Sequence, residues 1–196
     1  MYIKNSKTIV IKIGSSLLIK DGKIRYKWLD NFVNDIKKLT SQKKNIILVS
    51  SGAIALGCKK LNIKKKNLKI DMSQAIASIG QIELMNLLSK FFVKKKIDLS
   101  QILLTLEDTE KRKRAINAKR TLDNLFQMGF VPVVNENDST ATSEIKYGDN
   151  DRLASRVAQI SNADCLILLS DVDGLYSKNP KIFKSAKLIR EIVTID

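Results

Sequence analysis

Short apolar runs recur along the chain, and most of them end in a polar turn that leads into a stretch of helical periodicity. Runs rich in β-branched and aliphatic residues predict buried strands at 8–13, 45–50, 99–105, 130–134, 164–170 and 188–193. Apolar residues at helical spacing predict helices over 27–42, 72–92, 107–128 and 150–161. Strands that alternate with helices favour a three-layer α/β sandwich with a largely parallel central sheet.

Weaker local signals complete this prediction. A further helix is expected directly after Gly52, and Gly129 is expected to end the helix over 107–128 as its C-cap. The residues at 143–146 are expected to form a short hairpin arm. The helix over 72–92 is apolar on more than one face, so we expect it to be buried or to lie in the interface of a homo-oligomer.

The composition is that of a folded globular protein. The chain has 196 residues, of which 44% are hydrophobic and 28% are charged, enough for one domain with a sizeable core. It contains only two prolines and no Ser/Gly-rich linker that would mark a domain boundary. The sequence therefore predicts a single domain.

The charge balance raises the question of nucleic-acid binding. With 35 basic and 20 acidic side chains the formal net charge is +15. The lysines are scattered, however, and the basic stretches are not interleaved with aromatic residues as in RNA-binding strands. We therefore interpret them as solvated surface and expect no nucleic-acid partner, with a basic nucleic-acid patch as the alternative.

Two cysteines and an absence of histidine bear on metals and on the compartment. Without histidine a zinc site is not expected, and Cys58 and Cys165 lie in apolar surroundings that predict reduced core residues. The apolar run near the N-terminus is broken by Lys12, which fits neither a signal peptide nor a membrane span. We therefore expect a cytoplasmic protein without a membrane partner.

Polar residues cluster twice in the stretch from 131 to 157. The sequence NEND follows the strand over 130–134, and GDND, at 148–151, precedes the helix over 150–161. Ligands bind at the carboxyl ends of strands in open α/β sheets, so this stretch is a candidate site. The alternative is that Asn and Asp only form turns and cap a helix, which accounts for one cluster more easily than for two.

Two further strands end in small residues. Gly14 and two serines follow Lys12 and Ile13, and Ser51-Gly52 follows the strand over 45–50. Small residues let backbone N–H groups approach a phosphate, and helix N-termini attract anions. An ordinary strand-to-loop turn explains either one alone, but the two together favour an anion-binding crevice.

These motifs, in this order, resemble the amino-acid kinase family. The resemblance rests on KIGSS, VSSGAIALG, NENDS with EIKYGDNDRLA, and LLSDVDGLYSKNP, and it runs from about Thr8 to the end of the chain. NEND with EIKYGDND favours, within the family, the kinases that phosphorylate the side-chain carboxylate of glutamate. UMP kinases, aspartokinases and acetylglutamate kinases share the other segments.

The resemblance implies an ATP-dependent transfer to L-glutamate, the first step of proline biosynthesis, with Mg²⁺ accompanying the nucleotide. It also implies feedback inhibition by proline in or near the glutamate pocket. The implied roles are catalysis by Lys12 and Asp151, substrate binding by Gly14, Ser51, Gly52, Asp138 and Asn150, and nucleotide binding by Lys12, Ser170 and Asp171.

The resemblance further divides the chain into a substrate-binding half, 1–163, and the beginning of a nucleotide-binding half, 164–196. Relatives continue with a glycine-rich loop that carries a second catalytic lysine, so we expect the fold and the nucleotide site to be incomplete at the C-terminal end. Two alternatives remain open: another kinase of the same family, such as a UMP kinase, and a non-catalytic amino-acid-binding protein.

Overall fold

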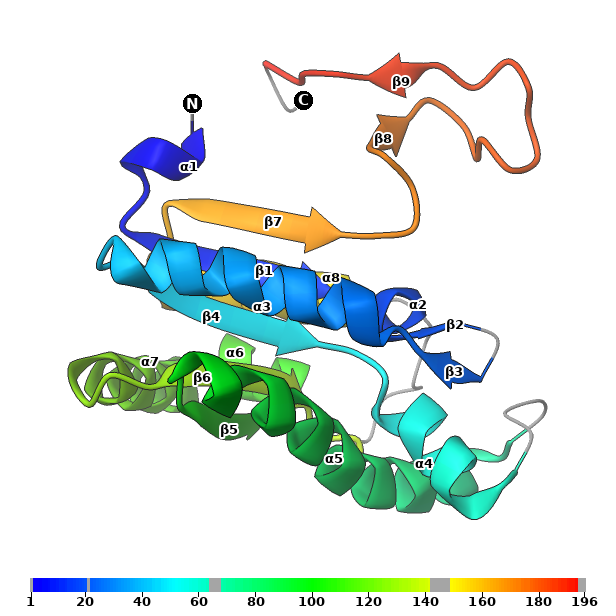
Figure 1. Ribbon diagram of the computed structural model, residues 1–196, viewed down its shortest axis with the longest axis horizontal. Helices are drawn as coiled ribbons and strands as arrows, with labels where there is room; N and C mark the ends of the chain where they lie inside the picture. Colours follow the sequence, from blue (N-terminus) through cyan, green and yellow to red (C-terminus); the bar gives the residue numbers. More distant parts are fainter. Residues whose placement is uncertain (1, 21, 64–67, 142–148, 194–196) are drawn as a thin grey trace.

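Five parallel strands form the centre of the molecule in a computed structural model that describes residues 2–20, 22–63, 68–141 and 149–193. In space the strands follow the order β5-β6-β4-β1-β7 (Figure 1). They are β1 (Thr8–Ile13), β4 (Asn45–Ser50), β5 (Leu99–Leu104), β6 (Val131–Glu136) and β7 (Cys165–Leu169). The five strands predicted up to residue 170 are confirmed, each to within two residues.

Helices cover both faces of this sheet because the strand side chains alternate. In β1, Ile9, Ile11 and Ile13 belong to one core cluster and Val10 to the other. The first cluster includes residues of α3 (Tyr26–Ser41) and α5 (Ile70–Phe92), and the second includes residues of α7 (Arg112–Gln127) and α8 (Asp149–Ile160). The predicted three-layer α/β sandwich is therefore confirmed.

Two glycines let α4 (Ala53–Leu61) lie directly against α5. A Cβ atom on Gly80 would meet the Ala53 carbonyl oxygen at 1.8 Å, and one on Gly57 would meet the Ile76 carbonyl oxygen at 2.2 Å. No side chain fits in that space without moving a helix backbone. The close approach fixes the first turn of α4, which follows Ser51 and Gly52 at the end of β4.

The apolar character of α5 is explained mainly by its packing. Nine of its residues are buried, among them Leu84, Leu88 and Phe92 in the core below α3. Residues 70–95 form a segment long and apolar enough to cross a membrane, the one such segment in the described part of the chain. A core helix of a globular protein meets the same criterion, and the buried contacts of α5 are of that kind.

The prediction of a single helix over 107–128 is wrong. The structure has two helices there, α6 (Leu106–Glu110) and α7, separated by Lys111 in an extended conformation with φ −74° and ψ 113°. Thr105 and Asp108 form a capping box that begins α6, and the extended backbone at Lys111 ends it after five residues. Gly129 does end α7, with φ +81° and its N–H bonded to the Phe126 carbonyl, as predicted.

The prediction of a strand over 188–193 is wrong in length. β9 (Leu188–Ile189) has two residues, because it pairs only with the two residues of β8 (Leu175–Tyr176). The hairpin arm expected at 143–146 lies outside the described residues. Short elements that the periodicity did not predict are α1 (Tyr2–Asn5), α2 (Ser15–Leu18), β2 (Ile19–Lys20), β3 (Lys23–Ile24) and η1 (Val93–Lys95).

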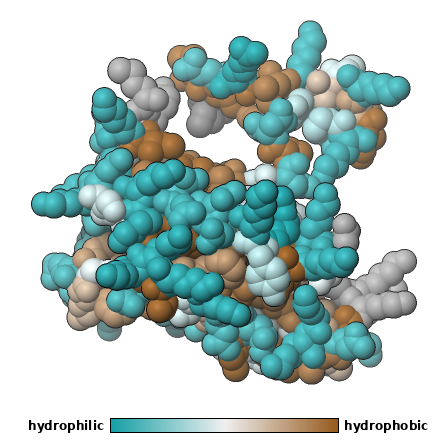
Figure 2. All heavy atoms as spheres, in the orientation of Figure 1, coloured by the Kyte–Doolittle hydropathy of each residue, from teal (hydrophilic) through white to brown (hydrophobic). Residues whose placement is uncertain are grey.

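The segment after β7 stands apart from the sandwich. Figure 1 shows β8 and β9 above the sheet, and Figure 2 shows open space between this arm and the main body. Apolar side chains on the arm are exposed, with Ile182 at 70% and Val193 at 89% of their full exposure. The arm therefore adds little to the core formed by the five strands and their helices.

Candidate active site

The carboxyl ends of the parallel strands meet at one edge of the sheet, and this edge carries the predicted site residues. The Gly14 N–H donates to the Leu169 carbonyl at 3.3 Å, and the Ser51 N–H donates to the Ile13 carbonyl at 3.1 Å. These bonds continue the pairing of β1 with β7 and β4 beyond the strand ends. The loops after β1 and β4 are thus held side by side.

Lys12 and Asp151 form an ion pair at this edge. Lys12 Nζ lies 2.7 Å from Asp151 Oδ1, with the lysine side chain 12% exposed and the aspartate 49% exposed. The alternation of β1 places Lys12 on the same face as Val10, which α8 covers, and Asp151 lies in the first turn of α8. A nearly buried ammonium group is thereby aimed at the strand ends by a single carboxylate.

Ser51 and Asn150 form a second pair beside the first. Asn150 Nδ2 lies 2.7 Å from Ser51 Oγ and 3.0 Å from the Ser50 carbonyl oxygen. Because Ser51 Oγ accepts the amide proton, its own hydroxyl proton is left to donate to another group, and a carboxylate is a suitable acceptor. Residues that are 99 positions apart in the sequence are thus joined by a direct hydrogen bond.

The two glycines of the strand-end loops differ in conformation. Gly52 has φ +113°, a value that other residues adopt only with strain, and it begins α4 as its N-cap. Gly14 has φ −68° and ψ 147°, which suits any residue. A Cβ atom on Gly14 would lie 3.8 Å from Lys12 Nζ, so the absence of a side chain keeps open the space next to the ammonium group.

Asp138 lies in the turn that follows β6 and is largely shielded from solvent. Burial raises the pKa of its carboxyl to about 6, because the charged form loses hydration. The turn is tied to the sheet by the Asn137 N–H, which donates to the Leu104 carbonyl at 2.9 Å, and to α5 by Gln74, whose amide donates to the Ala141 carbonyl at 3.1 Å. A cation next to Asp138 would restore its ionised form.

Ser170 and Asp171 lie at the same edge, after β7, but form a separate cluster. Ser170 Oγ donates to Asp171 Oδ1 at 3.4 Å, and Lys181 Nζ lies 2.5 Å from Asp171 Oδ2. Hydrogen bonding to Lys181 lowers the pKa of Asp171. The contacts among the described residues do not link this cluster to Lys12 or Asp151. Of the predicted residues, the structure thus joins Lys12 with Asp151 and Ser51 with Asn150 by direct contact.

Sequence reasoning missed a set of hydrogen-bonded amides behind the site, two of which are buried. Gln81 on α5 is 8% exposed and Asn135 at the end of β6 is 3% exposed. Gln101, Gln81, Asn135 and Asn150 are connected one to the next by hydrogen bonds, and we refer to these four residues as the amide network. Asn135 is the first residue of the NEND motif, so the motif could have identified it. No such motif surrounds Gln81, which is one of several polar residues in a largely apolar helix.

The described residues contain no group of three or more acidic, cysteine or histidine side chains that could hold a metal ion.

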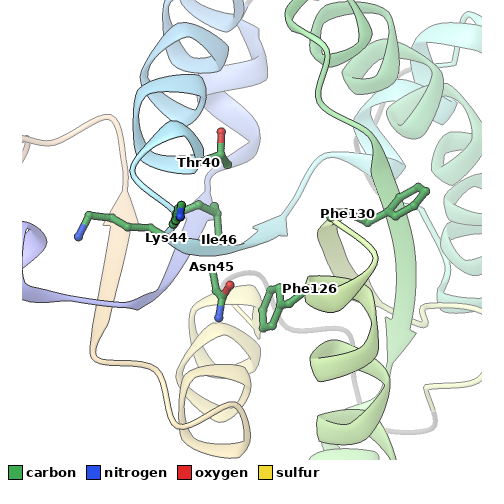
Figure 3. Close-up of a pocket in the computed structure, with 8 residues that line it drawn as sticks. Thr40, Lys44, Asn45, Ile46, Phe126 and Phe130 are labelled. Carbon is green, nitrogen blue, oxygen red and sulfur yellow. The ribbon is translucent and has the colours of Figure 1, made fainter.

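A pocket of about 280 Å³ lies at the opposite edge of the sheet, between the ends of α3 and α7 and the start of β4 (Figure 3). Lys44 lines it, but Figure 3 shows its side chain directed away from Phe126, and its Nζ is bonded to the Lys4 and Ser6 carbonyls at 3.0 and 2.5 Å. The pocket is therefore separate from the residues at the carboxyl edge and presents no free ammonium group of Lys44.

The carboxyl edge of the parallel sandwich thus carries a lysine–aspartate pair and an amide–hydroxyl pair. The model of the Amino acid kinase family matches residues 7–196. Since this match covers almost the whole chain, the chain belongs to the amino acid kinase family.

More specific similarity is to glutamate 5-kinases. The chain is 76% identical over 197 residues to the glutamate 5-kinase of Pelagibacter ubique (strain HTCC1062), a match that covers 100% of the chain and 54% of that relative. It is 49% identical over 191 residues to the glutamate 5-kinase of Nitrobacter hamburgensis, covering 96% of the chain and 50% of the relative. The chain thus spans about half the length of these relatives.

Solved structures support the fold. A T. acidophilum isopentenyl phosphate kinase product complex superposes with a TM-score of 0.64 at 18% identity, covering 94% of this chain and 79% of the other. A second isopentenyl phosphate kinase gives a TM-score of 0.65 at 17% identity, covering 95% and 81%. Likeness at this identity shows a shared fold and says nothing about the substrate of this chain.

Proposed function

We propose that the chain acts as a glutamate 5-kinase, which converts ATP and L-glutamate to ADP and L-glutamyl 5-phosphate, the first step of proline biosynthesis, in the cytoplasm. The observation that carries this proposal is the placement of the Lys12–Asp151 pair beside the Ser51–Asn150 pair at one edge of the sheet. The 76% identity to a glutamate 5-kinase supports the choice of glutamate as substrate.

The chemistry needs charge neutralisation more than proton transfer. The glutamate side chain has a reference pKa of about 4.3 and is already ionised at neutral pH, so the nucleophile needs no general base. Two unit charges 4 Å apart interact by about 4 kcal/mol at an effective dielectric constant of 20, so bringing this carboxylate to a phosphoryl group is costly. The Lys12 ammonium group offsets that repulsion, and Asp151 holds it in place.

In the transfer step, a side-chain carboxylate oxygen of glutamate forms a bond to the γ-phosphorus of ATP. The bond from that phosphorus to the oxygen bridging the β- and γ-phosphates breaks, and ADP leaves with the electron pair. No proton is consumed or released. Catalysis by Lys12 and Asp151 is then positioning and electrostatic stabilisation, with Gly14 leaving room for the phosphoryl group.

The remaining residues serve binding. The Ser51 hydroxyl and the backbone around Gly52 receive a carboxylate of the substrate, and Asp138 and Asn150 hold its ammonium group. The shielded carboxyl of Asp138 favours a cationic partner. Ser170 and Asp171 lie on the nucleotide side, where Mg-ATP binds. This assigns 1–163 to glutamate and 164–196 to the beginning of the nucleotide-binding part.

The proposal also includes feedback inhibition and a homo-oligomeric assembly. Feedback inhibition by proline would act at the glutamate pocket, because proline shares the α-carboxylate and the amino nitrogen that the pocket receives. Assembly into a homo-oligomer is supported by exposed apolar residues on α5, of which Ile70 is 56% and Ile82 is 63% exposed.

The test is ADP production from Mg-ATP by the 196-residue chain, with and without L-glutamate, alongside calorimetry of glutamate binding. Glutamate-dependent ADP release supports the kinase. Release that depends on UMP instead would assign the chain to a different branch of the family. Absence of binding and of turnover with glutamate would contradict the proposal.

A second candidate function is an amino-acid-binding protein without turnover. The exposure of Asp171 and its pairing with Lys181, in contrast to the burial of Gln81 and Asn135 behind the other end of the site, favours this candidate. Glutamate binding with no ADP formation at saturating Mg-ATP would support it over the kinase.

A further inference from the structure

The amide network runs without interruption from α5 to the candidate substrate site. Gln101 Nε2 donates to Gln81 Oε1 at 3.2 Å, and Asn135 Nδ2 donates to the same oxygen at 3.3 Å. Asn135 Oδ1 lies 3.3 Å from Asn150 Nδ2, which in turn lies 2.7 Å from Ser51 Oγ. Gln81 therefore accepts from both of its neighbours through its oxygen, whereas Asn135 presents its nitrogen to Gln81 and its oxygen to Asn150.

The backbone of one residue sets these orientations. Gln81 Nε2 donates to the Glu136 carbonyl at 3.3 Å, and the Glu136 N–H donates to Asn135 Oδ1 at 2.9 Å. A carbonyl can only accept and an N–H can only donate, so neither side-chain amide can be reversed without placing like groups together. The Glu136 backbone therefore anchors both amides to the end of β6, and the bond from Asn135 Nδ2 to Gln81 Oε1 is a second constraint on the orientation of Asn135.

The same donor and acceptor constraints fix the orientation of the Asn150 amide. Its Nδ2 lies within hydrogen-bonding distance of three oxygens, those of Ser50, Ser51 and Asn135. Reversing the amide would bring its oxygen against the Ser50 carbonyl and Asn135 Oδ1, neither of which can donate. The nitrogen is therefore committed to the protein, and the Asn150 oxygen is the atom left to accept from a substrate N–H.

We propose that Gln81 and Asn135 are positioning residues that fix the orientation of the Asn150 amide, so that its oxygen receives the substrate ammonium group and its nitrogen holds Ser51 as a donor. This inference rests on the proposed function for the identity of the substrate. Neither positioning residue contacts the substrate in this arrangement. Both act through Asn150, and Gln81 acts from a helix that is buried below the site.

The first test is Gln81→Met, which preserves the length of the side chain and removes both polar groups. It leaves Asn135 Nδ2 without its acceptor in a buried position, so Asn135, and through it Asn150, loses one of the hydrogen bonds that fix its orientation. We expect the dissociation constant for L-glutamate, measured by calorimetry on the full chain, to rise by about tenfold or more.

The matched control is Leu88→Val, a loss of buried contacts on the same face of α5, two turns further along. It lowers the melting temperature without touching the amide network, and glutamate affinity is expected to stay within about twofold. Gln81→Glu supplies the rescue, since a protonated carboxyl in a buried position keeps one donor and one acceptor. Its affinity, relative to the unmodified chain at the same pH, is expected to recover at pH 5 and fall at pH 8.

Equal weakening by Gln81→Met and Leu88→Val would reduce Gln81 to a structural residue and overturn the inference. If the unmodified chain does not bind glutamate, the proposed function fails, and the inference is decided by NMR of the Asn150 side-chain amide, assigned through its loss in Asn150→Asp. Gln81→Met is expected to shift this resonance pair and speed its hydrogen exchange, and Leu88→Val is not. An unchanged resonance pair in Gln81→Met would also overturn the inference.

Discussion

The two ends of the candidate site differ in how their side chains are held. At the proposed glutamate end, Asn150 and Ser51 are bonded to each other and backed by Gln81 and Asn135, which are less than a tenth exposed. At the proposed nucleotide end, Asp171 and Lys181 are exposed over 49% and 63% of their side chains. One end is preorganised by the protein itself, whereas the other takes its order from an exposed ion pair that is weak in water.

The position of each strand explains this difference. β4 and β6 each have a neighbour on both sides and a helix layer on both faces, so polar side chains at their ends are enclosed and must be bonded. β7 is the last strand in the order of the described sheet, and Leu168 on it is 49% exposed. Side chains after β7 therefore have fewer partners.

The largest expected effect is that of Asp151→Asn on turnover. The amide keeps the shape of the side chain but removes the charge that aims the Lys12 ammonium group. We expect ADP formation to fall by about a thousandfold, with stability changed by less than about 1 kcal/mol because Asp151 is half exposed. Asp123→Asn, on the exposed face of α7, is the control. Unimpaired turnover in Asp151→Asn would show that the lysine is positioned by other means.

Asp138→Asn probes the glutamate end through pH. The folded pKa of Asp138 is about 6 against 3.8 for the unperturbed carboxyl, so the folded protein holds the proton more tightly than the unfolded one. Stability should therefore fall as the pH rises from about 4 to about 6, by up to about 3 kcal/mol. The variant should lack this loss and be more stable than the parent at pH 7 in thermal unfolding.

The same substitution should weaken glutamate binding, because the carboxylate that pairs with the ammonium group is gone. In the parent chain, affinity should fall by about tenfold per pH unit below about 6, where Asp138 must first release a proton. A flat affinity profile between pH 5 and 7, measured by calorimetry, would remove Asp138 from the substrate site.

Gly52→Ala and Gly14→Ala separate backbone strain from space for the ligand. Alanine at Gly52 must adopt φ near +113°, which costs about 1–3 kcal/mol of stability and displaces the start of α4. Alanine at Gly14 fits the backbone, and its nearest neighbour would be the Leu169 carbonyl oxygen at 3.4 Å. It should keep the melting temperature and glutamate affinity but slow the transfer, since its methyl group lies next to Lys12. Equal melting temperatures for the two variants would refute the distinction.

The smallest effect is expected from Lys181→Ala at the nucleotide end. The ion pair with Asp171 is exposed and screened by salt, so its loss should change the free energy of unfolding by less than about 1 kcal/mol. Glutamate affinity should not change. Urea unfolding at low and at high salt measures this, and a large loss of stability would mean that the arm after β7 is held as firmly as the sandwich.

The sequence was sufficient to predict the sheet because its central strands are buried on both faces. TIVIKI and NIILVS are apolar runs that no amphipathic helix would carry, and both were placed without error. The break between α6 and α7 was missed because helical periodicity continues across Lys111. The capping box at Thr105 marks where α6 begins and not where it ends. Periodicity reports the buried face of a helix and not its interruptions.

The predicted site residues were found through motifs at strand ends, where small and polar residues interrupt apolar runs. The contacts between Lys12 and Asp151 and between Ser51 and Asn150 depend on which strands become neighbours, which local patterns do not encode. Gln81 was beyond reach for a related reason. Its partners come from β5 and β6, so its importance appears only after the helix has been packed against the sheet.

The strand order also has a consequence for how the chain folds during its synthesis on the ribosome. β1 is among the first segments to be synthesised, yet its neighbour β7 follows far later, and Asp164 binds the Thr8 N–H across 156 residues. Closing so long a loop carries an entropic cost. Ser51 likewise cannot pair with Asn150 until a further 99 residues have been synthesised. A nascent chain therefore exposes the edge of β1 that later pairs with β7 for seconds, and chaperone binding during translation would be expected over that interval.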